Sequence, residues 1–242
     1  MKPLIIIPTF NEEENIKKLI LDIFDNLKNI NFSILVVDDS SIDNTLSEIE
    51  ELNKKNISIL KRPSKLGLAS AYIDGINYGL KKGFDAFIEF DADFSHNPKY
   101  LAQMIDKLKD YDVVIGSRNI KNGSMKNRSL IRNLISIGGS MYAKIILNCP
   151  INDLTGGFNG WRKEIIEKIG LENIISKGYC FQVEMKYRAY LANAKITEFP
   201  IIFEDRKYGK SKMNKAIFFE AFLNILKLRI KLDNKSLPAF HK

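Results

Sequence analysis

The sequence has few of the residues on which many enzymes depend. Its 242 residues include two histidines, His96 and His241, and two cysteines, Cys149 and Cys180. So few histidines give almost no material for a Ser-His-Asp triad or a histidine-rich metal site. The cysteines stand in no CxxC or Cys/His arrangement, which argues against zinc and indicates packing residues in a reducing compartment.

Long apolar segments are also missing. The most apolar stretch, 216–232, is interrupted by Glu220, Lys227, Arg229 and Lys231. A membrane-spanning helix needs about 20 apolar residues with few charges, so this stretch does not span a bilayer. The four apolar residues 4–7 near the N-terminus are too few for a signal peptide. We therefore expect a cytoplasmic protein.

Several binding motifs are absent. The GKS at 209–211 lacks the leading glycine of a P-loop because Glu204 stands there, and His96 replaces the turn glycine of an EF-hand. No GxGxxG follows the first strand, and zinc-finger spacing and RNP signatures are missing, so we expect no nucleic-acid partner. The net charge of +8, from 37 basic and 29 acidic side chains, fits either solubility or an anionic partner.

What the sequence does contain is a regular alternation of apolar strands and helices. Strands are predicted over 4–7, 32–37, 57–60, 87–90, 112–116 and 196–203, and helices over 12–27, 45–52, 68–80, 98–108 and 130–147. Asn11 is expected to cap the first helix. Strands that are apolar on both faces predict a mainly parallel central sheet in a three-layer α/β/α fold. We expect one domain over 1–242, with a mobile polar loop at 120–129 and a short strand near 156–161.

Polar residues follow four of these strands where each strand ends. They are Pro8 to Phe10, Asp38 with Asp39, Asp91 with Asp93, and Ser117 with Arg118. Ligands of such sheets bind at the carboxyl ends of the strands. At i and i+2 of an extended segment, Asp91 and Asp93 would point the same way and hold a divalent ion with a diphosphate. An isolated Asp-x-Asp is more often a solvated turn, so this interpretation depends on the rest of the chain.

Seven segments carry a resemblance to a known family. They are IPTFNE (7–12), VVDDSS (36–41), DADFSH (91–96), GSR (116–118), DLTGGF (153–158), SKGY with FQ (176–182) and DRKYGKSK (205–212). In this order, across nearly the whole chain, they resemble a family 2 glycosyltransferase of the dolichyl-phosphate mannose synthase type. The first three are general to family 2, and the last three are more specific to polyprenyl-phosphate hexose synthases.

The resemblance implies a GT-A fold, a nucleotide-sugar donor with GDP-mannose preferred, Mg²⁺ or Mn²⁺, and a polyprenyl or dolichyl phosphate acceptor. The positions it implies for donor binding are Pro8, Phe10, Glu12, Val37, Asp39, Asp91, Ala92, Asp93, Arg206 and Lys212. Metal ligands are implied at Asp91, Asp93 and Ser95, and acceptor-phosphate ligands at Arg118 and Arg132, with Asp91, Asp93 and Arg118 catalytic. Ser95 stands where some relatives have Gln, and Phe10 where they often have Tyr.

Elementary chemistry is consistent with this reaction. The second pKa of a phosphate monoester is near ~6, so a lipid phosphate is largely ionised at neutral pH and needs orientation more than a general base. Arginine would hold it bidentately near the anomeric carbon, and a metal would stabilise the departing diphosphate. In-line displacement would invert the anomeric centre and give a β-linked product.

Some assigned residues also have plainer interpretations. Arg118 could form a surface ion pair, and Arg132 could belong to the polar face of its helix. Asp38 is a candidate helix cap, Glu12 is also an acid of a first helical turn, and His96 is expected to be a structural turn residue.

Two segments are expected to contact a membrane surface. These are an acceptor loop and amphipathic helix over 119–150 and a C-terminal amphipathic helix over 214–232, with Lys227, Arg229 and Lys231 near anionic headgroups. A core helix is the alternative for the first half of the C-terminal segment. The expected localisation is peripheral, on the cytoplasmic face of a membrane. Attachment through a membrane-anchoring partner subunit is the other alternative.

Other functions are less consistent with the residues. The same chemistry with UDP-glucose or another donor stays open, since no residue separates guanine from uracil. A nucleotidylyltransferase would need a glycine-rich basic loop after the first strand, whereas residues 8–14 are acidic. A non-catalytic basic module for a membrane surface would leave Asp91 and Asp93 unexplained.

Overall fold

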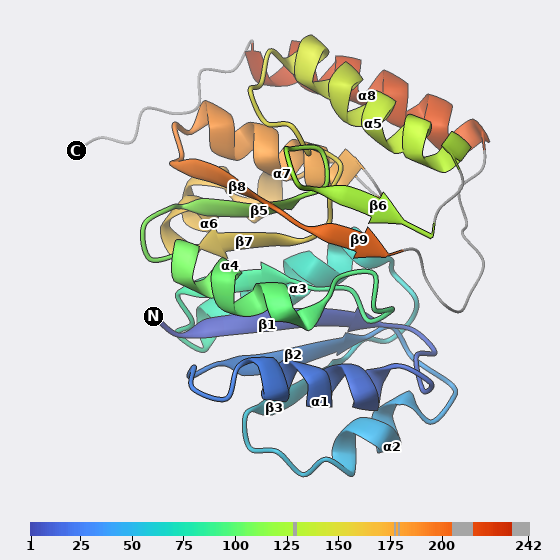
Figure 1. The fold of residues 1–242 in the computed structure, drawn as a ribbon, viewed down its shortest axis with the longest axis vertical. Coiled ribbons are helices and arrows are strands. Elements are labelled where there is room, and N and C mark those ends of the chain that lie inside the picture. Colours follow the sequence, from blue (N-terminus) through green and yellow to red (C-terminus); the bar gives the residue numbers. More distant parts are fainter. Residues whose placement is uncertain (128–129, 177, 179, 205–214, 234–242) are drawn as a thin grey trace.

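A seven-stranded sheet runs through the centre of the computed structural model (Figure 1). The structure describes residues 1–127, 130–176, 178, 180–204 and 215–233. The strands are β1 (Pro3–Thr9), β2 (Ser33–Asp38), β3 (Ile57–Lys61), β4 (Ala86–Glu89), β5 (Val113–Ser117), β7 (Asn159–Arg162) and β8 (Ile196–Pro200). Their order is β3-β2-β1-β4-β7-β5-β8. Every neighbouring pair is parallel except those of β7, which is antiparallel to β4 and β5.

Helices cover both faces of this sheet. They are α1 (Ile16–Asn26), α2 (Thr45–Glu50), α3 (Leu68–Lys81), α4 (Leu101–Lys107), α5 (Leu130–Leu147), α6 (Lys163–Ile169), α7 (Cys180–Leu191) and α8 (Lys215–Asp233), with short 3₁₀ turns at Pro98–Tyr100 and Leu171–Asn173. A separate two-stranded parallel sheet joins β6 (Ser124–Lys126) to β9 (Ile202–Glu204).

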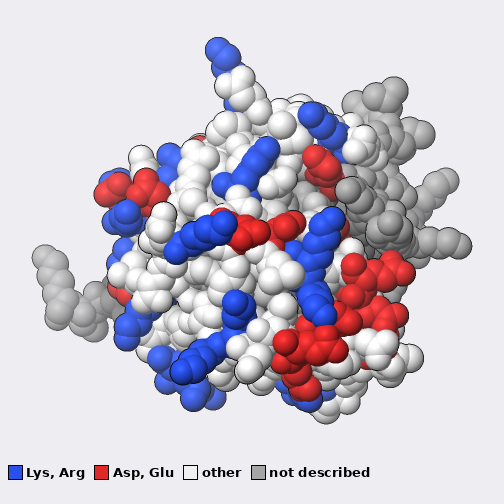
Figure 2. Space-filling view, turned by 60° about the horizontal axis from the view of Figure 1, so that its bottom comes forward, with Lys and Arg blue, Asp and Glu red and all other residues white. Residues whose placement is uncertain are grey.

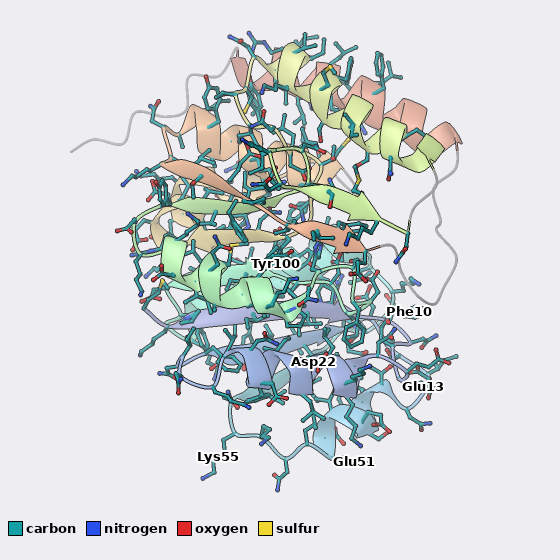
Figure 3. All side chains as sticks on the ribbon, viewed as in Figure 1. Phe10, Glu13, Asp22, Glu51, Lys55 and Tyr100 are labelled. Atoms are coloured by element: carbon teal, nitrogen blue, oxygen red, sulfur yellow. The ribbon has the colours of Figure 1, made fainter. Side chains whose placement is uncertain are left out.

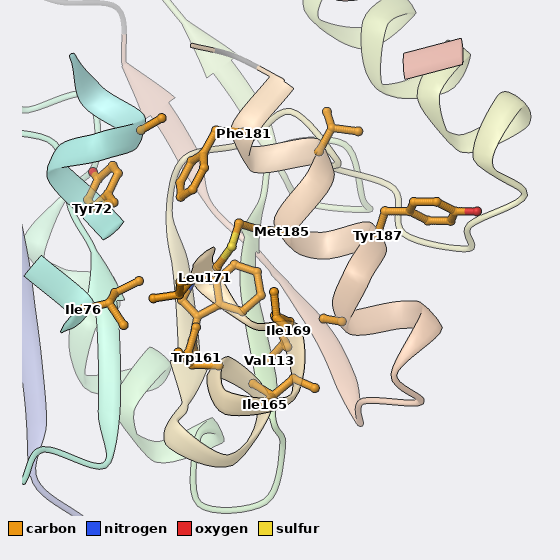
Figure 4. Packing of buried hydrophobic residues seen from close by; sticks show 14 of the residues in the cluster. Tyr72, Ile76, Val113, Trp161, Ile165, Ile169, Leu171, Phe181, Met185 and Tyr187 are labelled. Atoms are coloured by element: carbon orange, nitrogen blue, oxygen red, sulfur yellow. The ribbon is translucent and has the colours of Figure 1, made fainter. Parts of the chain in front are cut away.

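The two faces of the sheet form two hydrophobic cores. In β1, Leu4 and Ile6 belong to one core, while Ile5 and Ile7 belong to the other. The first core includes residues of α3, α6 and α7, and Figure 4 shows part of it around Trp161. The second includes residues of α1 and α4. This arrangement confirms the predicted three-layer α/β fold with a mainly parallel sheet.

The start of the first helix was predicted wrongly. Asn11 does not cap it, because its backbone φ is 58° and its Oδ1 accepts a hydrogen bond from Ile42 N at 3.0 Å. Glu12 N donates to Thr45 Oγ1 at 2.8 Å. These long-range bonds fix the segment before the helix to the loop after β2, so α1 begins only at Ile16.

The single strand predicted over 196–203 is two strands. β8 ends at Pro200, and β9 leaves the main sheet to pair with β6. Between them, Ile201 N donates to Ser117 O and Ile201 O accepts from Ser124 N, both at 3.0 Å. Part of the polar segment 120–129, predicted as a loop, is therefore the strand β6.

The helices α5 and α8 run parallel beside each other (Figure 1). The rings of Tyr142 and Phe222 stack 4.0 Å apart, and Arg229 Nη1 donates to Leu147 O at 2.8 Å. Arg229, which we expect near headgroups, is half-buried and binds this carbonyl at the end of α5. Among the described residues, no helix is both long enough and apolar enough to span a membrane.

Candidate active site

Four sequence-predicted segments meet at the carboxyl edge of the parallel strands. Thr9 at the end of β1 and Asp38 at the end of β2 are paired in register, and Thr9 Oγ1 donates to Asp38 Oδ1 at 3.0 Å. Asp38 Oδ2 also accepts from Ser41 N at 2.9 Å, which fits the predicted supporting role. The same edge carries the Asp91 turn after β4 and Arg118 after β5.

Asp39 is fixed by a buried arginine that the sequence did not reveal. Arg62 Nη1 lies 2.9 Å from Asp39 Oδ1, and Asp39 Oδ2 accepts from Gly67 N at 3.0 Å. Arg62 also donates to Ser70 Oγ at 2.6 Å. Gly67 has φ 95°, a conformation that favours glycine, so the turn can direct its N–H at the carboxylate. Asp39 is thereby held between β2, β3 and the start of α3.

Phe10 lies at the same edge with a lysine over its ring. Figure 3 places Phe10 near Glu13, and Lys65 Nζ is 3.3 Å from the centre of the Phe10 ring. Glu12 Oε2 accepts from Asn15 Nδ2 at 2.9 Å. Of the other residues predicted to bind the donor, Pro8 is half-buried, while the side chains of Val37 and Ala92 are buried in the cores.

The two aspartates of the DADFSH segment lie in a turn. β4 ends at Glu89 and the chain turns at Ala92 and Asp93, so the predicted extended geometry of Asp91 and Asp93 is wrong. Asp91 Oδ1 accepts from Tyr72 OH at 2.8 Å, and the Asp91 side chain is 23% exposed. Asp93 is buried, and its Oδ1 accepts from Ser95 N at 3.0 Å. The two carboxylates therefore have different surroundings.

Tyr72 stays a hydrogen-bond donor to Asp91. Burial raises the pKa of Tyr72 well above its usual value, and the negative charges of Asp91 and Glu89 raise this pKa further. The sequence did not identify this residue, because at its position in α3 it looks like an ordinary core aromatic.

His96 is a structural residue of the turn, as predicted. It is buried, and its ring stacks on that of Phe158 with 5.3 Å between the ring centres. The Phe203 ring lies edge-on to it, with 5.4 Å between the centres. Its Nε2 lies 3.6 Å from Asp91 Oδ2. The aromatic packing fixes one side of the aspartate turn.

Arg118 forms a buried ion pair instead of a surface one. Its Nε donates to Asp153 Oδ2 at 2.8 Å and its Nη2 to Asp153 Oδ1 at 2.7 Å, and Arg118 N also donates to Asp153 Oδ2 at 2.8 Å. Burial opposes ionisation of Asp153, but the charge and hydrogen bonds of Arg118 hold the pKa of Asp153 at about 2. Burial lowers the pKa of Arg118, while the charges of Asp153 and then Asp91 raise it above its usual value. Arg118 is therefore permanently charged, at the sheet edge that also carries Asp91.

A buried glutamate lies below this edge. Burial raises the pKa of Glu89 to about 7, while the hydrogen bond from Asn159 and the neighbouring amide of Gln182 lower it. Asn159 Nδ2 donates to Glu89 Oε2 at 2.8 Å. This polar group connects β4 and β7 directly beneath the Asp91 turn.

The structure does not describe the side chains of three residues that we predicted for the site. Arg206 and Lys212 lie outside the described residues, and Arg132 lies in α5 with its side chain outside them. Among the residues that are described, no group of three or more His, Cys, Asp or Glu side chains gathers as a metal site. A groove of about 390 Å³ lies between α1, the 93–98 turn and β9, and Asp93 and Ser95 are among its lining residues.

The positive charge of the protein is spread out on the face drawn in Figure 2. Acidic side chains gather in one area there, while Lys and Arg are scattered over the rest. The net charge of +8 therefore forms no single basic surface on this face.

The fold defines the class of protein. The structure is similar to glucosyl-3-phosphoglycerate synthase from Mycobacterium tuberculosis in complex with phosphoglyceric acid, with a TM-score of 0.67 and 12% identity over 95% of this chain and 79% of that one. Its complex with Mn²⁺, UDP and glucosyl-3-phosphoglycerate gives a TM-score of 0.66 at 12% identity, covering 99% and 81%. At such low identity the likeness shows the fold alone, which is of the GT-A glycosyltransferase type.

Sequence comparison gives the family. The family model "Glycosyl transferase family 2" matches residues 4–170, so the chain belongs to this family and is a glycosyltransferase. It is 38% identical to an undecaprenyl-phosphate mannosyltransferase of Micrococcus luteus over 227 residues, 93% of each chain. It is 35% identical to a polyprenol monophosphomannose synthase of Mycolicibacterium smegmatis over 238 residues, 96% of this chain and 89% of the relative. These comparisons confirm the predicted resemblance to polyprenyl-phosphate mannose synthases.

Proposed function

We propose that the protein transfers mannose, in preference to other hexoses, from GDP-mannose to a polyprenyl or dolichyl phosphate with inversion at the anomeric carbon. The relatives named for polyprenyl-phosphate mannose synthesis align over nearly their whole lengths. The observation that carries the proposal is that an aspartate turn after β4 and a buried arginine after β5 meet at one sheet edge, where both border the segment 153–157. A sugar diphosphate and a phosphate acceptor need these two groups close together.

The donor nucleotide fits the β1–β2 end of this edge. Phe10 offers an aromatic face and Asp39 a fixed carboxylate that can accept hydrogen bonds from ribose hydroxyls. Lys65 adds a cation over the Phe10 ring. The same residues would accept a uridine nucleotide, so UDP-glucose is the alternative donor.

Asp91 and Asp93 fit a Mg²⁺ or Mn²⁺ ion that is shared with the donor. Mg²⁺ typically binds proteins through one or two carboxylates together with substrate phosphates, so a site without a third carboxylate is adequate. When bound, the ion would stabilise the charge of the departing diphosphate. Tyr72 and Ser95 N hold one oxygen each of Asp91 and Asp93, which limits the orientations that the carboxylates can take.

The acceptor phosphate fits the Arg118 end. Asp153 occupies Nε and Nη2 of the guanidinium, so within the described part of the chain Nη1 is the nitrogen left for a ligand. A lipid phosphate is largely ionised at neutral pH, since its second pKa is near ~6. The reaction therefore needs this anion to be oriented, and the buried His96 is not required as a base.

The acceptor is a lipid, and the outer faces of α5 and α8 fit a membrane surface. Ile137, Met141 and Ile145 of α5 recur every four residues and are exposed, as are Phe222, Leu223 and Ile230 of α8. Lys227 and Lys231 are exposed on α8 beside them. We expect peripheral attachment to anionic bilayers through this surface. Flotation with anionic liposomes tests it, and absence of co-migration at low salt would favour a membrane-anchoring partner subunit instead.

Product formation from radiolabelled GDP-mannose and a polyprenyl phosphate tests the reaction. We expect mannosyl lipid with Mg²⁺ or Mn²⁺, none with EDTA, and loss of product in Asp93→Asn. Transfer from UDP-glucose alone would keep the mechanism and change the donor. No transfer from either donor to any polyprenyl phosphate would contradict the proposed function.

A further inference from the structure

We propose that Lys186 is a positioning residue, whose buried ammonium fixes the loop 153–156 and, through Asp153, the guanidinium of Arg118. The inference rests on the proposed function in one respect, namely that Arg118 binds the acceptor phosphate. Lys186 lies on α7, and among the described residues its hydrogen bonds all go to the loop 153–156, so its effect should be confined to the acceptor.

The ammonium of Lys186 is fully buried and fully hydrogen-bonded. Its Nζ donates to the backbone oxygens of Asp153 at 3.0 Å, Leu154 at 3.2 Å and Gly156 at 2.6 Å. An ammonium has three donors, so one bond to each carbonyl satisfies it. Three peptide groups of one short loop are thus turned toward a single cation.

This arrangement directs the other side of the loop at the site. Asp153 N donates to Glu198 Oε1 at 2.9 Å, so the backbone of Asp153 is held at both its N–H and its C=O. Its carboxylate then points at Arg118, which also donates from Nη2 to Thr155 Oγ1 at 3.1 Å. A Cβ on Gly157 would lie 3.8 Å from Asp91 Oδ2, so the loop also borders the aspartate turn.

The charges around Lys186 come from four elements of the structure. Burial lowers the pKa of Lys186 to about 8, while Asp153 of the loop, Glu89 of β4 and Glu198 of β8 raise it and Arg118, just after β5, lowers it. The cation therefore lies among three acids and binds the loop that carries one of them. Replacing it with a neutral side chain would free the loop carbonyls and leave these acids with less positive charge nearby.

The same helix offers a matched control. Arg188 is also a buried cation of α7, but its Nη2 donates to Asn173 O at 2.7 Å and its Nε to Glu184 Oε1 at 2.8 Å. These bonds support a different segment, and among the described residues none of them goes to the loop 153–156. Arg188→Met should therefore reproduce the cost of losing a buried cation without moving Arg118.

Steady-state kinetics of the full chain test the inference. In Lys186→Met we expect the KM for polyprenyl phosphate to rise about tenfold, a typical effect of losing a supporting contact, with the KM for GDP-mannose unchanged. Lys186→Gln, which keeps amide donors, should show a smaller rise and serves if the Met variant does not fold. Arg188→Met should lose thermal stability and keep both KM values. Equal acceptor KM in wild type and both Lys186 variants, or the same rise in Arg188→Met, would overturn the inference.

Hydrogen exchange separates this inference from the proposed function. Amides of residues 153–157 should exchange faster in Lys186→Met and not in Arg188→Met, which should affect 173–176 instead. Unchanged exchange at 153–157 would refute the role of Lys186 whatever the substrate. A wild-type enzyme inactive on every polyprenyl phosphate would refute the proposed function alone.

Discussion

The helices α3 and α7 contribute to the same hydrophobic core but are built differently. α3 buries one face, with Ala71, Tyr72 and Ile76 inside, and the small Gly75 and Gly79 allow it to lie close to β1 and β4. α7 buries ten consecutive residues, from Cys180 to Ala189. Three of these carry charge, namely Glu184, Lys186 and Arg188. Packing alone can hold α3 in place, whereas α7 needs a partner for each buried charge.

The difference between the helices extends to the site. Around the start of α3, one arginine holds Asp39, and Tyr72 holds Asp91. Beside α7, the buried ammonium of Lys186 holds the loop 153–156, and Asp153 of this loop binds Arg118. The donor end is therefore stabilised mainly by apolar packing with a few polar contacts at its edge. The acceptor end depends on charges in the interior, and it should be the more sensitive of the two to loss of a charge.

The largest effect is expected for Asp153→Asn. The neutral side chain leaves the buried Arg118 without a counter-charge, and breaking a buried pair from one side costs about 3–5 kcal/mol of the free energy of unfolding. Urea unfolding measures this loss, and the acceptor KM should rise as well. Asp106→Asn, which removes an exposed carboxylate paired with Lys109, should leave the unfolding midpoint unchanged. Equal midpoints for Asp153→Asn and wild type would contradict the comparison.

A smaller effect, at the other end of the edge, is expected for Arg62→Met. Asp39 would lose its guanidinium partner and keep only the bond from Gly67 N, so GDP binding should weaken about tenfold. Calorimetric titration with GDP measures this, and the KM for polyprenyl phosphate should not change. Lys61→Met, one residue earlier but exposed, is the control. A change in acceptor KM alone would show that the two ends are not independent.

The sequence predicted the regular part of this molecule well. The strands β1 to β5 of the main sheet were found because buried parallel strands are continuous apolar runs, as in Leu4 to Ile7 and Ile34 to Val37. α3 was found because its buried residues recur at the helical period. α7 was not predicted, because a helix buried all round has no apolar stripe, and its charged residues look like a solvated face.

The sequence predicted which residues form the candidate site better than it predicted the contacts between them. The sequence placed Asp39, Asp91 and Arg118 at strand ends, where the structure has them. Their partners Arg62, Tyr72 and Asp153 are 23, 19 and 35 residues away, and no local pattern connects them. The predicted start of α1 was wrong for the same reason, since hydrogen bonds to the loop after β2 determine where the helix begins.

Acid should weaken the α7 side of the molecule through Asp153. Its pKa is about 2 in the folded state and 3.8 ordinarily, so the carboxylate contributes stability above the ordinary value and loses it as the pH falls toward 2. The difference corresponds to about 2 kcal/mol of the free energy of unfolding. Urea unfolding between pH 5 and pH 2 measures the slope, and Asp153→Asn should show a shallower one. Identical slopes would show that other carboxylates account for the acid sensitivity.

An effect of about the same size as that of Arg62→Met is expected for Tyr72→Phe on α3. The ring and its packing against Phe181 remain, and only the hydrogen bond from Tyr72 OH to Asp91 Oδ1 is lost. A hydrogen bond to a charged group contributes about 1.5 kcal/mol or more, so the Mg²⁺ or Mn²⁺ concentration for half-maximal activity should rise about tenfold. Tyr78→Phe, on the same helix and half-buried, should leave the metal dependence unchanged. If Tyr72→Phe lowered thermal stability as much as Asp153→Asn, without a change in metal dependence, α3 would depend on interior polar contacts as α7 does.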